Sequence, residues 1–361
     1  MVKPDILEEL RKETAGEDLD LSWLEQPAAE HGIRVTPGKR GLTLEEISVG
    51  SYGNPPEITS NKSGRLRGSA PRPDAQQLGK HWSSKSESWS DSAMMLYEEA
   101  LQRQWSSATD IPWQEMPDLD EDLELAMSQL CTFLTQVEFI AGDEPGKFAP
   151  NISGDHFEMG LFLASQIMDE ARHLDVFRKR ALSNGIGLLQ CGPGAVGLLT
   201  AQNFVEMTAQ LHIVGEGFVQ SVFRMGELIA HSEVDKRIFR LAAQDESRHV
   251  AFGVMHMKHM LETEPERREE VHTYLDRMEG QVGVVPNQSG LTGGGETTEA
   301  LAILLGGGSD EVRLNEGYNK LMAVRRRQLK EYVHRLEVAG LGDRIERMPA
   351  RMRAFVEQAQ N

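Results

Sequence analysis

A five-residue motif occurs twice in this chain, first as DEARH and later as DESRH, and each copy places a glutamate three residues before a histidine. Residues three positions apart lie on the same face of an α-helix. Glu170 can therefore bind one metal ion together with His173, and Glu246 can bind another together with His249. The repeat predicts two helices that face a shared metal centre.

Each copy is preceded by a further glutamate on an apolar helix face. Glu138 lies one turn after Leu134, and Glu216 lies on the stripe that contains Leu211 and Val219. An isolated buried charge is costly, so a carboxylate at such a position is expected to be paired or bound to metal. A lone Glu-x-x-His is typical of a solvated helix face, whereas two copies with upstream glutamates favour a metal site.

The spacing of apolar residues predicts an all-α chain built on four long helices. The expected boundaries are a first helix from Asp118 to the polar segment 141–154, a second from a capping box of Asp155 and Glu158, a third over 201–228, and a fourth from Ser232 with Asp235 as its cap partner. The third and fourth helices form a hairpin that brings their two glutamates to the same height.

Composition divides the chain into three parts. Residues 1–90 are rich in Ser, Gly, Pro and charge and predict a disordered or loosely docked arm, which Trp82 and Trp89 could pin to the body. Residues 91–280 hold the helical bundle. Residues 281–361 begin with a glycine-rich stretch, equally compatible with a lid and a connector, and continue as two amphipathic helices that pack on the bundle or on a second subunit.

Charge and apolar content exclude several classes of function. The formal net charge of −18 argues against nucleic acid or an anionic membrane surface as a partner. No apolar run approaches the ~20 residues of a membrane span, and no secretory signal is visible at the N-terminus. Cys131 and Cys191 are too few for a disulfide framework, so we expect reduced thiols in a cytoplasmic protein.

The proposed ligand types suit iron or manganese. Carboxylate oxygens and imidazole nitrogens are the ligands that these metals bind well. Four carboxylates supply four negative charges, which two divalent ions neutralise. Two of the carboxylates, Glu170 and Glu246, are expected to bridge the ions at the ~3.5–4 Å separation of two-metal sites.

Charged residues inside the motifs predict a supporting shell. Asp169 and Asp245 precede the ligand glutamates, and Arg172 and Arg248 precede the histidines. A metal-bound imidazole usually donates its other N–H group to a carboxylate. We expect each aspartate to accept from the histidine of the opposite motif, with the arginines neutralising the aspartates.

Several nearby residues leave alternatives open. Glu206 is a rival to Glu216 but sits off the apolar stripe. His212 is expected to be a core histidine, and the alternatives are a hydrogen-bond donor to a ligand or a further metal ligand. Gly215 and Gly217 flank Glu216, and they either permit a helix distortion or allow close packing. His156, His256 and His259 are expected to be structural or exposed.

The segments LASQIMDEARHLDVF and LAAQDESRHVAFG resemble the ferritin-like superfamily of carboxylate-bridged di-iron proteins, over roughly residues 118–261. The oxygen-activating members, such as the hydroxylase subunits of bacterial multicomponent monooxygenases and the small subunit of ribonucleotide reductase, look most similar. The resemblance implies a ferritin-like four-helix bundle with additional N- and C-terminal helices. It implies two iron ions, or a manganese–iron pair, held by Glu138, Glu170, His173, Glu216, Glu246 and His249.

Three positions depart from the marks of known subgroups. Phe177 stands where radical-storing reductase subunits have a tyrosine, and Gln220 stands where the monooxygenases have a threonine. Ala242 stands where di-iron arylamine N-oxygenases have an extra histidine. The resemblance therefore specifies the superfamily and not one activity.

The function expected from these residues is a di-iron, dioxygen-activating oxidoreductase of the monooxygenase, hydroxylase or N-oxygenase type. It would act on a small organic substrate, receive electrons from a ferredoxin or reductase, and form a homodimer. Phe177, Leu211, Val219 and Phe223 are expected to line a pocket that excludes water. The alternatives are a radical-generating subunit resembling the ribonucleotide reductase small subunit, and a ferroxidase or iron-binding protein.

Overall fold

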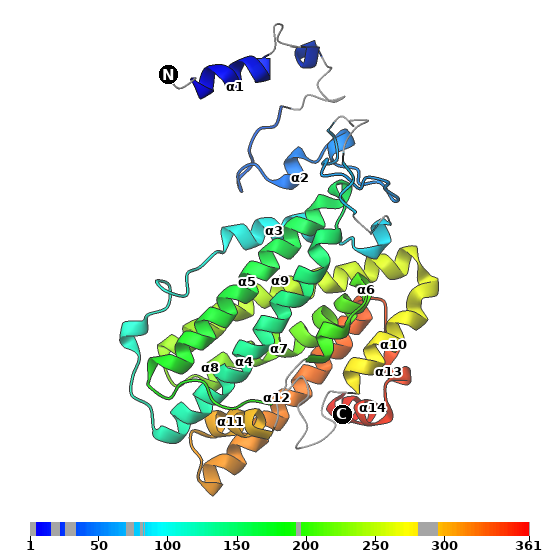
Figure 1. Ribbon diagram of the computed structural model, residues 1–361. Helices are drawn as coiled ribbons and strands as arrows, with labels where there is room; N and C mark the ends of the chain where they lie inside the picture. The colour runs from blue at the N-terminus through cyan, green and yellow to red at the C-terminus, as the bar shows by residue number, and fades with distance from the viewer. Residues whose placement is uncertain are drawn as a thin grey trace.

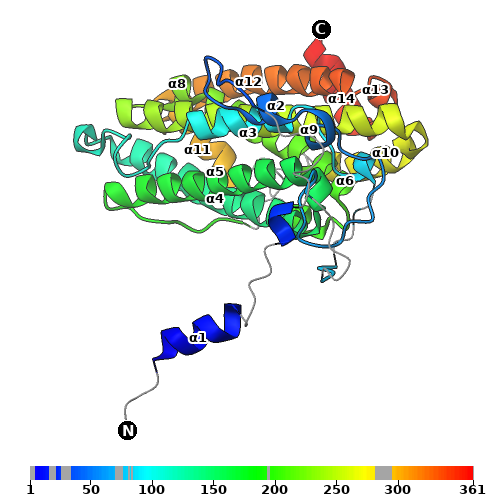
Figure 2. The same cartoon turned by 90° about the horizontal axis from the view of Figure 1, so that it is seen from above.

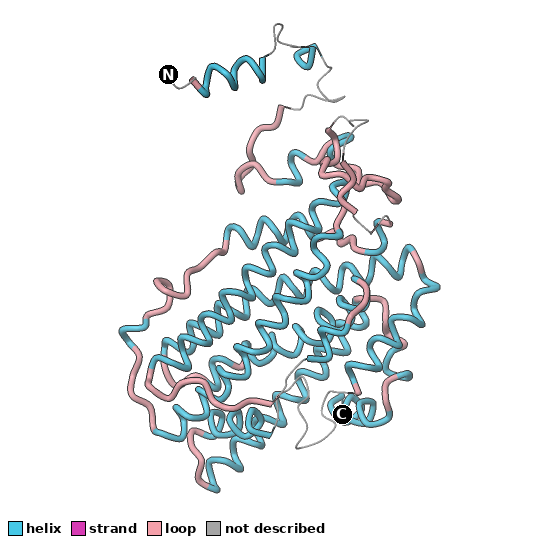
Figure 3. Tube along the Cα trace, viewed as in Figure 1, coloured by secondary structure: helices cyan, strands magenta, loops and turns pink. Residues whose placement is uncertain are grey.

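Helices make up the regular secondary structure throughout the part of the chain that the computed structural model describes (Figure 3). That part comprises residues 5–15, 22–25, 34–69, 76–79, 82, 84–192, 196–280 and 295–360. The all-α class predicted from the sequence is confirmed.

Four helical segments form the centre of the molecule, and they lie side by side in Figures 1 and 2 as two antiparallel pairs joined by a long crossover. They consist of α4 (Glu121–Phe148), α5 (Phe157–Ser183), a composite third arm of α6 (Phe204–Met207), the π-helix η8 (Thr208–Glu216) and α7 (Gly217–Arg224), and finally α9 (Glu233–Thr263). α4 packs on α5, while α9 packs on η8 and α7. As predicted, Ser232 caps α9 by accepting a hydrogen bond from the Asp235 backbone N–H at 3.0 Å.

The first arm is longer than the sequence predicts. α4 continues through most of the segment expected to be a loop and ends at Phe148, with Pro145 inside the helix. Phe148 and Pro145 are both buried, so packing of this last part outweighs the backbone bond that proline removes. Asp120 occupies the N-cap position in place of Asp118. Glu138 therefore lies well inside a helix, not near its end.

The capping box predicted at the start of the second arm is wrong. Asp155 and Glu158 bind the N-terminal arm instead of the backbone of α5. Asp155 accepts a hydrogen bond from the Thr59 hydroxyl, and Glu158 forms a buried ion pair with Arg67, whose Nη1 lies 3.1 Å from Glu158 Oε2. These two carboxylates thus bind side chains that are far away in sequence and not the backbone of their own helix.

The N-terminal arm contacts the end of the bundle through both tryptophans. The Trp82 ring packs against those of Phe148 and Phe204, with centroids 5.7 and 5.5 Å apart, and Trp89 is buried. The short helix α1 (Ile6–Ala15) lies away from the bundle in Figures 1 and 2. Other parts of the arm, including residues 70–75, lie outside the described residues.

The C-terminal part packs along the bundle. Further helices of the chain are α2 (Leu44–Ile47), α3 (Ala93–Gln102), α8 (Gly226–Ile229), α10 (Arg268–Glu279), α11 (Gly295–Gly306), α12 (Glu311–Val338), α13 (Arg344–Arg347) and α14 (Ala350–Gln360). Of the predicted glycine-rich stretch, residues 281–294 lie outside the described residues. The rest is mainly α11, which packs between α4 and α12 and buries Leu301 and Leu304.

None of the helices within the described ranges is both long enough and apolar enough to span a lipid bilayer.

A buried ionic cluster joins α4, α5 and α9, and its removal tests how much it stabilises the bundle. Arg180 on α5 donates to both carboxylate oxygens of Glu124 on α4, at 2.5 and 3.1 Å, and to Asp235 on α9. Replacement by Arg180→Met leaves two buried carboxylates without their cation and should lower the free energy of unfolding by about 3–5 kcal/mol. Denaturant titration measures this loss. The exposed neighbour Arg178 offers a matched control, since Arg178→Met should change stability by less than about 0.5 kcal/mol.

The two free cysteines should differ in reactivity. Burial in α4 raises the pKa of Cys131 to about 12, whereas Cys191 is only partly buried. A thiol reacts as its thiolate, so raising the pH to 9 should not expose Cys131 to alkylation while the protein stays folded. Mass spectrometry after iodoacetamide treatment should show one label at Cys191, and a second only in denaturant. Labelling of both thiols in the folded protein would contradict this packing.

Candidate metal centre

The six predicted ligand residues come together in the middle of the bundle. Glu138 comes from α4, the first motif from α5, Glu216 from the end of η8, and the second motif from α9. Their potential ligand atoms form two overlapping groups, and within each group the atoms lie within 4.8 Å of one another. The groups are Glu138, Glu170, His173 and Glu246, and Glu170, Glu216, Glu246 and His249. Glu170 and Glu246 belong to both groups, which is the arrangement that bridging carboxylates require.

Both histidines present Nδ1 to the carboxylates. His173 Nδ1 lies 3.2 Å from Glu170 Oε2, 3.3 Å from Glu246 Oε1 and 3.7 Å from Glu138 Oε2. His249 Nδ1 lies 2.9 Å from Glu170 Oε1 and 3.3 Å from Glu246 Oε2. A ring nitrogen holds at most one proton and cannot satisfy three carboxylate oxygens at once. A divalent cation bound between the ring nitrogen and these carboxylates can bind several of their oxygens at once.

The carboxylate oxygens themselves are poorly satisfied by the protein. Oε1 of Glu138, of Glu170 and of Glu246 receives no well-directed hydrogen bond within the described part of the chain, although all three side chains are fully buried. Buried polar atoms normally have partners, and those without one call for an ion or a water. The donor set, four carboxylates and two imidazoles, therefore fits two divalent metal ions.

The pKa shifts of the site also favour the binding of metal ions. Burial raises the pKa of Glu138 and of Glu216 well above the ordinary value, and repulsion from Glu170 and Glu246 adds to both shifts. Burial alone lowers the pKa of His173, but hydrogen bonds to Asp245 and the glutamates raise it well above the ordinary value. Without metal, these raised pKa values would keep protons on Glu138, Glu216 and His173, and metal binding would release those protons.

The supporting aspartates are crossed between the motifs, as the sequence predicts. Asp245 Oδ2 lies 3.2 Å from His173 Nε2, and Asp169 Oδ2 lies 3.3 Å from His249 Nε2. Arg248 Nη2 donates to both aspartates, at 2.7 and 2.6 Å. Arg172 also contacts both, at 3.0 Å to Asp245. Each histidine is thus fixed with Nδ1 toward the carboxylates by a hydrogen bond on its other nitrogen.

Trp105 extends this network, and the sequence analysis did not single it out. Its Nε1 donates to Asp245 Oδ2 at 2.7 Å, and its ring stacks on that of His173 with centroids 6.4 Å apart. Trp105 follows α3, far from both motifs in sequence. No local signal marks it, because only the folded arrangement brings it to Asp245.

Gln166 is a second residue that sequence reasoning missed. It lies one helical turn before Glu170, so its position on the motif face could have identified it. Its Nε2 donates to Glu216 Oε1 at 3.1 Å, and its Oε1 accepts from His212 Nε2 at 3.0 Å. His212 therefore supports Glu216 through Gln166 and belongs to neither potential ligand group.

The structure distinguishes Glu216 from Glu206, the other glutamate considered as a ligand. Glu206 is buried, but it pairs with Arg277 and accepts a 3.2 Å hydrogen bond from Gln210, outside both ligand groups. Glu216 is the last residue of η8, whose nine residues are all buried. π-Helical turns are rare and are often found at functional sites.

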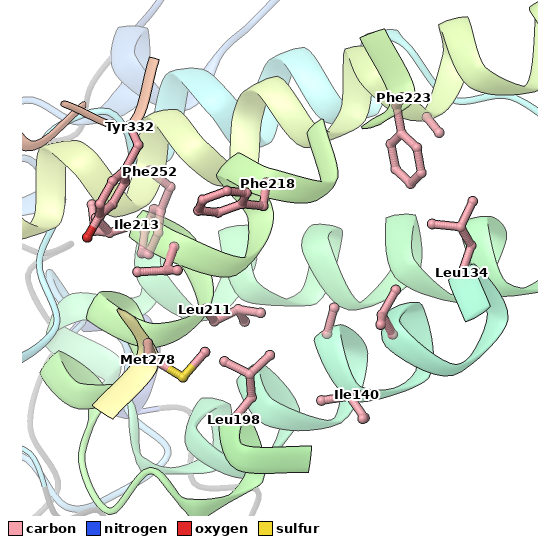
Figure 4. Packing of buried hydrophobic residues seen from close by; sticks show 14 of the residues in the cluster. Leu134, Ile140, Leu198, Leu211, Ile213, Phe218, Phe223, Phe252, Met278 and Tyr332 are labelled. Carbon is pink, nitrogen blue, oxygen red and sulfur yellow. The ribbon is translucent and has the colours of Figure 1, made fainter. Parts of the chain in front are cut away.

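The predicted pocket lining divides into two clusters. Leu211 and Val219 line a small enclosed cavity of about 10 Å³ beside Glu138 and Glu216, together with Leu198. Figure 4 shows Leu198 and Leu211 next to each other between α4 and the third arm. Such a volume accepts about one water-sized molecule.

The two phenylalanines lie elsewhere. Phe177 packs against Phe223 and Phe239, with ring centroids 5.2 and 5.8 Å away, and Phe223 meets the ring of His173 at 5.9 Å. They therefore shield the first histidine and do not line the cavity, which corrects the prediction of a single pocket. His156 and His256 are structural as expected, bonding the backbone oxygens of Pro56 and Trp89.

The chain has a ferritin-like helical fold, and its buried carboxylates and histidines form two groups that could each hold a metal ion. Two solved structures are similar to it, both variants of an R2-like ligand-binding oxidase with a reconstituted Mn/Fe cofactor, one reconstituted aerobically and the other anaerobically. Each is 17% identical over 68% of this chain, with a TM-score of 0.50, and the match covers 93% and 92% of their chains. The likeness shows a common fold. No protein-family model and no curated protein matches the sequence.

The crossed aspartates can be tested one at a time. Asp245→Asn keeps the shape of the side chain but removes the charge that faces His173, Arg172 and Arg248. Metal affinity should fall about 10- to 100-fold, the range observed when such outer partners of a ligand are lost. A competition titration with a chelator measures it. Asp175→Asn, a substitution of the half-exposed aspartate on α5, serves as control and should leave the affinity unchanged.

Proposed function

We propose that this protein is a dioxygen-activating dimetal oxidoreductase that oxidises a small organic substrate by hydroxylation or N-oxygenation. The observation that supports this most is the pair of overlapping buried ligand groups that share Glu170 and Glu246. A structural metal site needs one closed ligand set, whereas two adjacent divalent ions with shared carboxylates suit two-electron redox chemistry. The cofactor would be two iron ions or a manganese–iron pair.

Bound metals would supply the electrons for reducing dioxygen, and the chain's own residues would control where this happens. Glu138 and Glu216 lie on the side that faces the small apolar cavity, and we propose that dioxygen approaches from this side. Leu198, Leu211 and Val219 exclude bulk water there. The histidines lie on the opposite side, where the crossed aspartates and arginines hold their orientation.

Electrons are proposed to come from a ferredoxin or a reductase. The path that we propose within the protein runs from Trp105, which is buried, through Asp245 to His173, and hydrogen bonds connect these three side chains. We also propose a homodimer. Size-exclusion chromatography with light scattering tests the dimer independently of the chemistry.

The proposed activity predicts a specific stoichiometry. Protein loaded with ferrous iron, or with manganese and iron together, should contain two metal ions per chain, and the reduced form should consume dioxygen. Glu246→Ala removes a residue common to both groups and should abolish binding of both ions. Glu262→Ala, on the same helix but exposed, is the matched control and should bind two. A wild-type chain that binds fewer than two metals, or that does not react with dioxygen, would refute the proposal.

A second candidate function is a radical-generating subunit that resembles the ribonucleotide reductase small subunit. The hydrogen-bonded series Trp105, Asp245 and His173 favours it, because such a series can pass a single electron. The position of a stored tyrosyl radical is filled by Phe177, packed among aromatic rings, so the oxidant would have to stay on the metals. Copurification with a large catalytic reductase subunit would support this candidate, and many rounds of iron oxidation in a cage-like assembly would support an iron-storage protein.

A further inference from the structure

A side chain from the C-terminal part of the protein meets the backbone beside Glu216. Arg335 on α12 donates through Nε to the carbonyl oxygen of Ile213 in η8, at 3.2 Å. Arg335 is 8% exposed, and no carboxylate of the described residues lies within ion-pair distance of its guanidinium. Burying a guanidinium without a carboxylate is costly. The hydrogen bond to the Ile213 carbonyl oxygen offsets part of this cost.

Gly217 makes room for this arginine. A methyl group added at Gly217 would lie 2.6 Å from Arg335 Nε and closer still to the guanidinium carbon. The corresponding methyl at Gly215 would meet ordinary contacts, the nearest 3.5 Å away. Of the two alternatives that the sequence left open, Gly217 therefore allows close packing. It does so at the residue directly after the predicted ligand Glu216.

Other α12 residues reach the same junction. Gln328 Nε2 donates to the carbonyl oxygen of Phe218 at 3.4 Å. The Arg335 guanidinium lies over the ring of Tyr332, 5.6 Å from its centroid, and Tyr332 packs on Phe218. Figure 4 shows Tyr332, Phe218 and Ile213 at one end of the buried cluster. The helix changes there from π to α geometry, and backbone carbonyls on both sides of that change receive donors from α12.

α12 is itself held rigidly at this point. The Tyr332 hydroxyl donates to Glu279 Oε1 at 2.6 Å, and Arg344 Nη2 donates to Glu279 Oε2 at 2.7 Å. All three side chains are buried. A continuous network thus runs from α13 through the end of α10 and α12 to the backbone of η8.

We infer that Arg335 is a positioning residue for Glu216, which it holds in place by bracing the π-helical backbone from α12. The inference rests on the proposed metal centre, because Glu216 belongs to only one of the two ligand groups. Glu138, its counterpart, lies within the regular helix α4. Loss of the brace should therefore affect the two metal positions unequally, weakening the group that contains Glu216 and His249.

Stepwise metal titration of the full-length protein tests this asymmetry. Ferrous iron added anaerobically, and separately manganese(II), should bind wild-type protein in two steps. In Arg335→Met, one of the two steps should weaken at least about tenfold while the other stays within about twofold. Gly217→Ala should show the same pattern, although alanine favours a helix over glycine. Arg335→Lys keeps a charged donor and should recover part of the loss. Arg327→Met, an exposed change on the same helix, is the control.

Hydrogen exchange gives a readout that needs no metal. In metal-free Arg335→Met, amides of η8 and the start of α7 should exchange about tenfold faster than in wild type, while those of α5 stay unchanged. Equal loss of both metal steps, or unchanged exchange in η8, would overturn the inference. Faster exchange in η8 together with a wild type that binds no metal pair would instead uphold the brace and refute the proposed function.

Discussion

The requirement to keep four carboxylates in one buried shell determines most of this structure. Glu138, Glu170, Glu216 and Glu246 are all essentially inaccessible to water, and burial together with repulsion from Glu170 and Glu246 raises the pKa of Glu138 and of Glu216. Charges so placed need cations at fixed positions. The two histidines, the crossed aspartates and the paired arginines are arranged around that need. α4 and η8 each contribute one of the six potential ligand residues, whereas α5 and α9 each contribute two, together with an aspartate and an arginine.

The sequence predicted the centre of the molecule better than its ends. Glu170, His173, Glu246 and His249 are related by helical geometry alone, so their placement follows from a spacing of three residues. The crossing of the aspartates followed from the chemistry of a metal-bound imidazole. The first relation is local, and the second joins residues far apart in sequence but follows from the repeated motif, and the structure shows the geometry that both imply.

Predictions failed where partners distant in sequence replace local ones. Asp155 and Glu158 have the spacing of a capping box, but Thr59 and Arg67 from the N-terminal arm bind their carboxylates. The segment that ends at Phe148 has a polar sequence, yet α4 continues to its end. Trp82 from the N-terminal arm packs on Phe148, the last residue of that helix. Trp105 and Arg335 reach the site only through folding. None of these contacts leaves a periodic signal in the chain.

The doubled motif suggests two equivalent halves, but the backbone makes them different. In the first half, the upstream glutamate is carried by a continuous α-helix that packs along α5. In the second, it ends a π-helix whose carbonyls receive donors from α12. A π-helix is a less stable backbone form and persists only when surrounding contacts favour it. The first potential ligand group is thus supported by the four-helix bundle alone, whereas the backbone beside Glu216 in the second group also contacts the C-terminal helix α12.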